Sequence, residues 1–223
     1  MMLQLQSLGM KMYKLIAPTN YILVTDSASE PLTLSEVKIF LRIDSDDYDG
    51  ILTPLITTVR QLAERITGRD MINKTWKCYL DNDCNNLLYP NYYNGINSCV
   101  GIEILKSKLQ SITSIQYYSN DVLTTWSSSN YYITDEQDYS SINLVDGGSF
   151  PSDIDNRKQA VVITFVSGYG ADASFVPQAL KEAMLYHISA LFENSGDCDA
   201  CESTLYEKMY TPYTISKLLF DVI

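Results

Sequence analysis

The chain has 223 residues, 46% of them hydrophobic, which is enough to build a real core in one larger domain or two small ones. Its 27 acidic and 16 basic side chains give a formal net charge of -11, which repels phosphate and argues against sequence-specific DNA binding. An acidic surface can still let DNA pass without retaining it. No apolar run is long enough to span a membrane and the first residues lack the order of a signal peptide, so the sequence predicts a soluble intracellular protein.

The first predicted helix begins in the stretch PLTLSEVKIFLRI. Thr33 and Glu36 have the spacing of a capping box, in which each side chain accepts a hydrogen bond from the backbone N–H of the other residue. Leu32 and Val37 can form a hydrophobic staple around this cap. These signals agree, and they place the start of the helix at residue 33.

A second helix is predicted in DDYDGILTPLITTVRQLAERITGRD, with Gly68 as its stop. Its start has two readings. Asp46 or Asp47 caps the helix and Pro54 kinks it from inside, or Thr53 caps it and Pro54 takes the first helical position. The predicted apolar stripe consists of Ile51, Leu55, Ile56, Val59, Leu62, Ala63 and Ile66.

The connection LRIDSDDYDG holds four aspartates in seven residues, which raises the question of a calcium loop. Counted from Asp44, the glycine position of an EF-hand falls on Asp49 and its glutamate position falls on Leu55, so the register fails. The aspartates are instead expected to solvate a tight helix connection and to complement a helix N-terminus.

From Met71 onward the period becomes alternating, which predicts an antiparallel sheet or sandwich of about six strands. Gly168 and Gly170 close the last strand. The expected strands lie in residues 75–81, 102–108, 111–119, 130–135, 140–145 and 159–170.

Helical spacing returns after Pro177, and Leu180, Ala183, Met184, His187 and Leu191 share one face. A short helix is expected over residues 203–210, before an apolar tail that should dock on its own domain or on a partner.

The predicted fold class is therefore α+β, a helical bundle of N- and C-terminal helices with an inserted small antiparallel sheet or sandwich. Its parts are an N-terminal extension (1–30), a body (31–213) with helices in 33–69, a β insertion at 71–170 and helices in 177–210, and an apolar C-terminal tail (211–223).

The sequence assembles no catalytic or metal site. Cys198 and Cys201 have half the spacing of a zinc site, but the other three cysteines offer no second pair, and an odd cysteine count suits reduced thiols. His187, the single histidine, is expected to be a packed or hydrogen-bonded core residue. SGYG at residues 167–170 lacks the lysine of a phosphate loop, and the aromatic LYPNYYNG has no basic neighbours. The sequence thus predicts no enzyme, no metal and no cofactor.

Four motifs follow one another along the chain: PLTL from Pro31, Arg42 with the acidic cluster Asp44, Asp46 and Asp47, TGR at Thr67–Arg69, and Thr75–Trp76. Their order resembles that of the head-tail connector proteins of tailed bacteriophages, the adaptors beneath the portal. The resemblance covers about residues 31–213, and further pieces are LQSITSIQYY, VVITFVSGYG and HISALFENS. The matching motif residues are Pro31, Thr33, Leu34, Glu36, Arg42, Asp44, Asp46, Asp47, Thr67, Gly68, Arg69, Thr75, Trp76, Gly168, Gly170 and Pro177. Ser195 and Thr214 stand where the family commonly has a basic residue.

The resemblance implies a structural virion protein made in the host bacterial cytoplasm. It would form a homo-oligomeric ring, typically of twelve copies, between the portal above and a tail or further adaptor protein below. DNA would pass through the channel without sequence-specific binding. The proposed contacts to the portal or to a neighbouring subunit are Tyr213, Ile215, Leu218, Leu219 and Phe220, because an apolar end gains most by burial against a partner.

Two other classes are weighed against this one. A tail or baseplate component with a ligand-binding β module would use the tyrosine-rich loop within residues 81–99. A thiol or metal hydrolase would need Cys198, Cys201 and His187 to converge. Neither class accounts for the ordered series of motifs.

Overall fold

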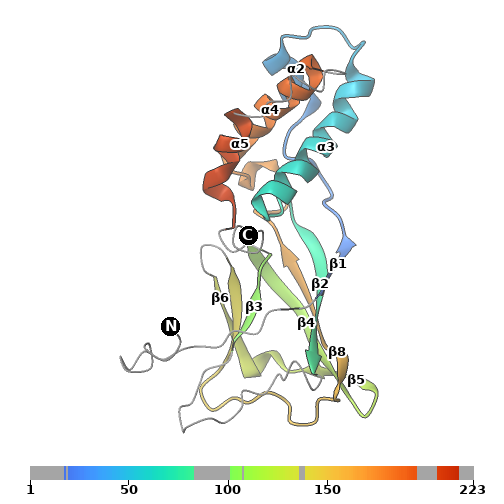
Figure 1. The fold of residues 1–223 in the computed structure, drawn as a ribbon, viewed down its shortest axis with the longest axis vertical. Helices are drawn as coiled ribbons and strands as arrows, with labels where there is room; N and C mark the ends of the chain where they lie inside the picture. The colour runs from blue at the N-terminus through green and yellow to red at the C-terminus, as the bar shows by residue number, and fades with distance from the viewer. Residues whose placement is uncertain are drawn as a thin grey trace, which may run out of the picture. The chain divides into compact units, whose positions relative to one another are not determined.

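A computed structural model of the chain describes residues 18, 20–82, 101–106, 108–135, 139–194 and 205–215. These residues form an α+β fold with four α-helices and two sheets (Figure 1). The chain divides into two compact units and crosses between them several times. The first unit holds residues 1–22, 76–105 and 112–165, and the second holds residues 23–75, 106–111 and 166–223. None of the helices in the described residues is both long and apolar enough to cross a membrane.

The second unit contains the four helices of the described residues, and helices from both ends of the sequence share one core. They are α2 (Leu34–Leu41), α3 (Asp49–Thr67), α4 (Gln178–Glu193) and α5 (Leu205–Tyr210). Helix α4 contacts each of the other three helices (Figure 1). The fully or nearly buried residues of this core include Val37, Leu52, Val59, Ala63, Leu180, Met184, Ile188 and Tyr210. Burial of these side chains is what holds short helices such as α2 and α5 in place.

Helix α2 begins as predicted, at a complete capping box. The Thr33 hydroxyl accepts a hydrogen bond from the Glu36 N–H (3.2 Å), and a Glu36 carboxylate oxygen accepts one from the Thr33 N–H (2.7 Å). This prediction is confirmed.

The start of α3 differs from both readings of the sequence. The helix begins at Asp49 with Tyr48 as its N-cap residue, makes no side-chain cap bond, and includes Pro54. The carboxylates of Asp46 and Asp49 both bind the Lys38 ammonium, at 2.6 and 2.9 Å, so this ion pair fixes the turn in place of a side-chain cap. The three predicted caps, Asp46, Asp47 and Thr53, are therefore wrong, whereas Pro54 does lie inside the helix, as the first reading has it. The apolar stripe also shifts, because Leu52 is buried whereas Ile51 is exposed.

Eight strands form the two sheets. The five-stranded sheet has the order β1-β2-β8-β4-β5, and the three-stranded sheet has the order β3-β7-β6. The strands are β1 (Asn20–Thr25), β2 (Lys74–Asn82), β3 (Ile102–Ile104), β4 (Leu109–Ser119), β5 (Val122–Trp126), β6 (Tyr131–Asp135), β7 (Ser140–Leu144) and β8 (Arg157–Ser167). The pairs β4–β5, β3–β7 and β6–β7 are antiparallel. The sequence predicts six of these strands but not β1 or β5, whose side chains are largely exposed and so lack a buried alternating face.

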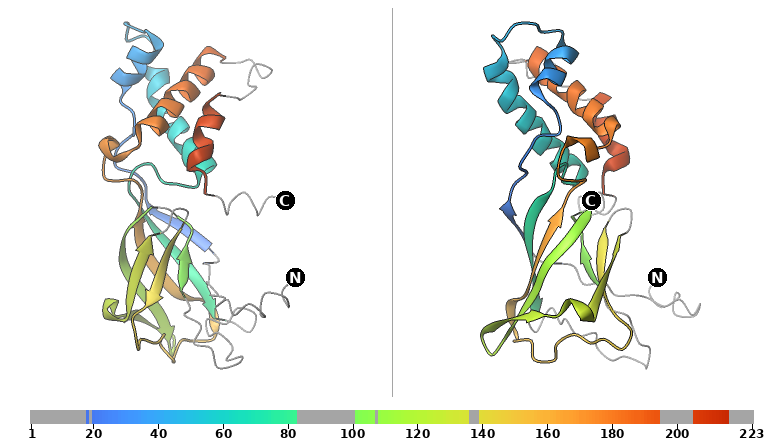
Figure 2. Two further views of the ribbon diagram at one scale, coloured as in Figure 1. Left: turned by 90° about the vertical axis from the view of Figure 1, so that its left-hand side faces the viewer. Right: turned by 180° about the vertical axis from the view of Figure 1, so that it is seen from behind.

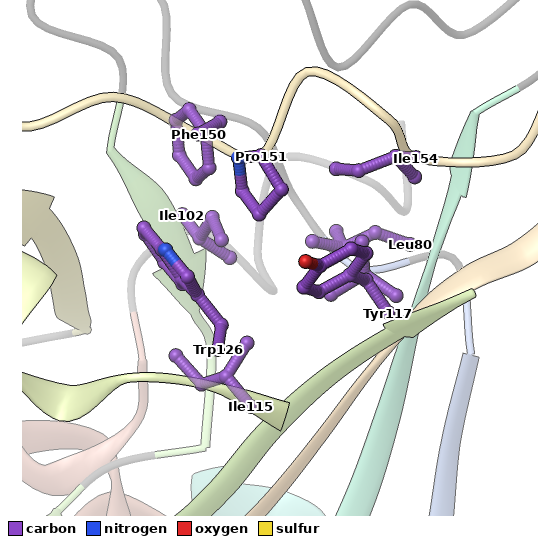
Figure 3. A pocket seen from close by; sticks show the side chains of 9 residues that line it. Leu80, Ile102, Ile115, Tyr117, Trp126, Phe150, Pro151 and Ile154 are labelled. Carbon is purple, nitrogen blue, oxygen red and sulfur yellow. The ribbon is translucent and has the colours of Figure 1, made fainter. Parts of the chain in front are cut away.

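The two sheets of the first unit enclose an apolar core. Trp126 packs between Tyr131 and Phe150, with a ring separation of 5.2 Å on each side. Figure 3 shows Trp126, Ile102, Leu80 and their neighbours around a cavity of about 10 Å³. That volume is about the space that one water molecule needs, so the cavity is a packing defect and not a ligand site.

Gly168 meets a strict backbone requirement in the second unit. Its φ is +144°, and a Cβ atom there would lie 2.7 Å from the backbone nitrogen of Asn73. Gly168→Ala is expected to lower the free energy of unfolding by more than about 2 kcal/mol, because the obstructing atoms are backbone. Gly50→Ala is the matched control, since a Cβ at Gly50, in the first turn of α3, meets nothing within 4 Å. Thermal melts of both variants test this, and equal melting temperatures would contradict it.

Candidate partner-binding surfaces

The outward face of α2 carries a broad hollow of about 650 Å³. It is lined by Leu34, Ser35, Lys38, Ile39, Arg42, Ile43 and Asp44. Ile39 is 76% exposed, the most exposed large apolar side chain in the described part of the chain. The hollow, with Ile39 exposed on it, is the candidate partner-binding surface on this helix.

Arg42 ends α2 in an unusual conformation. It has φ 59° and ψ 41°, in the left-handed region, and its N–H donates to the Ile39 carbonyl oxygen at 3.2 Å. This backbone conformation costs a residue with a Cβ atom about 1–2 kcal/mol of conformational free energy. Helices therefore often end in a glycine, as α3 does at Gly68. The Arg42 side chain is exposed and makes no hydrogen bond or ion pair within the described residues. The strained backbone of Arg42 thus places at the hollow a guanidinium that has no partner among the described residues.

Three contacts hold α2 against its neighbours. The Lys181 ammonium on α4 lies 2.8 Å from a Glu36 carboxylate oxygen, and Phe40 packs edge-on against Tyr186. Lys38 holds the α2–α3 connection through Asp46 and Asp49, which answers the question of the aspartate cluster. Two of the four carboxylates are held by one lysine, and Asp49 also lies in the first turn of α3.

A buried ion network lies beside α3. The side chain of Arg60 is only 3% exposed, and its Nε donates to Glu30 at 2.8 Å while its Nη1 lies 3.2 Å from Glu64. The Lys74 ammonium contacts both Glu64 (2.6 Å) and Asp26 (2.8 Å). Burial raises the pKa of Glu64 although the hydrogen bond from Lys74 opposes this shift. The network thus joins the segment after β1, which holds Asp26 and Glu30, to α3 and to the start of β2.

The beginning of the apolar tail docks on its own unit. The Tyr213 carbonyl oxygen accepts a hydrogen bond of 2.6 Å from Arg69 Nε, and the Ile215 N–H donates to the Thr67 carbonyl oxygen at 3.0 Å. Ile215 is fully buried and Tyr213 is half-buried. Leu218, Leu219 and Phe220 lie outside the described residues. The part of the tail that remains for a partner therefore begins after Ile215.

His187 is a core residue, as predicted. Its ring stacks on Tyr206 with a centroid separation of 4.0 Å, and its Nδ1 lies 3.5 Å from the Tyr210 hydroxyl oxygen. Burial lowers the pKa of His187 to about 4, against the opposing effect of the Glu207 charge. No cluster of three or more histidine, cysteine, aspartate or glutamate side chains among the described residues could hold a metal ion. Cys198 and Cys201 lie outside the described residues.

Because His187 is the single histidine of the chain, its contribution to the pH dependence of stability can be measured directly. Its ordinary pKa is about 6.5, so below that pH the unfolded chain takes up a proton more readily than the folded chain. This contribution to stability is present above pH 6.5 and is lost as the pH falls toward 4. The imidazole resonance in NMR is expected to titrate with a midpoint near 4. A midpoint near 6.5 would contradict the buried placement.

The remaining predicted motif residues hold backbone turns or sheet positions. Gly68 ends α3 with φ 73°, and Pro177 is the N-cap residue of α4. Trp76 lies on β2, half-buried. Asp44 is exposed at the hollow. Sequence reasoning missed Arg60 and Lys74, although the spacing of Arg60 and Glu64 is that of a helical ion pair.

Comparison with known proteins finds a matching protein family. The model of the family described as phage gp6-like head-tail connector protein matches residues 31–123 and begins at the proline where the series of sequence motifs begins. The matched residues are similar to the phage gp6-like head-tail connector family over somewhat less than half of the chain. The recognition of a head-tail connector from the sequence motifs is confirmed. The connector family is a structural family of the virion and not a family of enzymes.

Three solved structures share the connector fold. A chain in the neck of an empty gene transfer agent (GTA) particle, computed with C6 symmetry, matches with a TM-score of 0.69 and 15% identity, over 88% of this chain and 95% of that chain. A chain in the virion of a native GTA particle has a TM-score of 0.65 and 16% identity, over 87% and 94%. A chain in the neck of a native GTA particle, computed with C12 symmetry, has a TM-score of 0.60 and 16% identity, over 86% and 94%. No curated protein matches the connector chain at a significant level.

Proposed function

We propose that the chain is the subunit of a ring at the head–tail junction, placed below the portal, which continues the channel through which DNA leaves the head. The family match carries this proposal. The solved structures with the same fold come from particle necks computed with C6 and C12 symmetry, which supports a ring of twelve copies. In this proposal the subunit is made in the cytoplasm of the host bacterium and ends in the virion.

The physical properties of the chain suit that role. A net charge of -11 disfavours retention of DNA by the ring as a whole, as a channel requires. The four helices share one core, which gives the subunit a rigid part for lateral contacts. The portal above and a tail or further adaptor protein below are the proposed partners. In this proposal residues 31–213 form most of the ring body, to which strand β1 also belongs, and the tail after Ile215 reaches the portal.

The described residues offer no observation in favour of a ligand-binding β module. The cavity between the sheets is too small for a ligand and wholly apolar.

Electron microscopy of the purified protein, alone and mixed with its portal, tests the proposal. Ring-shaped particles with a central channel are expected, stacked coaxially on the portal in the mixture. A protein that stays monomeric in both samples would contradict the proposal.

A further inference from the structure

Two exposed faces of the helical unit lie on opposite sides of α4. Helix α2 forms one face and α5 forms the other, and both contact α4 (Figure 2). A ring is built from a heterologous contact, in which one surface of a subunit meets a different surface of the next copy. Two faces on opposite sides of one rigid unit are what such a contact requires.

The α5 face carries an exposed apolar side chain and two exposed charges. Leu205 is 55% exposed, and Glu207 and Lys208 are both exposed. Within the described residues, neither charged side chain has a hydrogen bond or ion pair. The inner face of α5 is already used, because Tyr206, Met209 and Tyr210 pack into the core of the unit.

The α2 face carries the matching set. Its hollow exposes Ile39 and holds two charged side chains, Arg42 and Asp44, with no partner among the described residues. Each face thus presents an apolar side chain, one free cation and one free carboxylate. The cation comes first along the chain in one set and second in the other, so that Arg42 can meet Glu207 while Asp44 meets Lys208. Charge patterns of this kind fix the register of a contact and reject wrong partners.

We propose that α5 of one copy docks into the α2 hollow of the next copy, with Leu205 against Ile39 and with Arg42–Glu207 and Asp44–Lys208 ion pairs. This contact rests on the proposed ring function and names the surfaces that build the ring. It also gives a reason for the strained backbone of Arg42. The left-handed conformation sets a free guanidinium at the rim of the hollow, where the neighbouring copy brings a carboxylate.

Charge reversal on the full-length protein tests the contact. Arg42→Glu and Glu207→Arg are each expected to reduce the yield of rings, counted by electron microscopy in the presence of the portal, by about tenfold, since each change turns an attraction into a repulsion at every contact. The double variant is expected to recover most of the wild-type yield. Arg65→Glu on α3 is the control and should assemble like the wild type, because Arg65 is exposed and has no ion pair within the described residues.

An equimolar mixture of the two single variants distinguishes a contact between copies from an effect within one subunit. In a head-to-tail ring of even number, the variants can alternate, so that every contact has one positive and one negative partner. Two variants that fail alone are therefore expected to form rings together. Circular dichroism melts that match the wild type show that the single variants fold.

The outcomes separate this contact from the function that underlies it. Suppose that the wild type forms rings. If the single variants then assemble normally, or if both the double variant and the mixture stay defective, the contact is overturned and the proposed function stands. A wild-type protein that forms no ring on the portal would overturn both.

Discussion

Removal of residues 216–223 is expected to leave a folded subunit that is absent from portal-containing particles. The cut falls after Ile215, whose buried side chain and hydrogen bond to Thr67 belong to the fold of the subunit itself. The removed segment contains Leu218, Leu219 and Phe220, which gain most by burial on a partner. Particles purified from cells that make only the truncated protein are assayed for it by mass spectrometry, and a near-complete loss is expected.

Two further variants sharpen this result. Replacing Leu218, Leu219 and Phe220 together with serine should reproduce the loss, whereas Lys217→Ala in the same segment should not. Melting temperatures within about 2 °C of the wild type would show that the subunit itself is intact. Incorporation of the truncated protein at the wild-type level would refute the role of the tail.

Arg60→Met is expected to be the most destabilising single substitution in the ion network. The arginine is almost fully buried and pairs with Glu30 and Glu64, so its removal leaves the half-buried Glu30 carboxylate without its cation. Glu64 then keeps only its contact with Lys74. Breaking a buried ion pair from one side costs about 3–5 kcal/mol. For a chain of this size that corresponds to a fall in melting temperature of roughly 6–20 °C.

Arg65→Met on the same helix is the matched control. Arg65 is exposed and makes no ion pair among the described residues, so its replacement is expected to change the free energy of unfolding by less than about 0.5 kcal/mol. Urea unfolding of the two variants measures the difference. Equal midpoints would show that the network around Arg60 contributes nothing to the fold.

Local sequence signals predicted local structure well. The capping box at Thr33, the stop at Gly68 and the buried face around His187 all depend on residues within four positions of each other, and each is present. Near the start of α3, by contrast, Lys38 binds Asp46 and Asp49, eight and eleven residues away. No periodicity or cap preference records a pairing at that distance, so the sequence did not show that these aspartates were bound to a lysine.

The candidate partner-binding surfaces could be predicted only in part from the sequence. Arg42 was noticed as a motif residue, but its left-handed backbone and free guanidinium follow from how α2 ends against the next turn. Leu205 and Glu207 gave no sequence signal, since their exposure depends on which face of α5 packs on α4. The tail was identified from its composition, but the composition could not show that Ile215 is already buried in its own subunit.

The position of the protein within purified virions tests the central claim most directly. Cryo-electron microscopy of the vertex from which DNA leaves should resolve a ring of these subunits around the channel, coaxial with the portal and in contact with it. Density for the protein at any other place in the particle, or as single copies without a ring, would contradict the account.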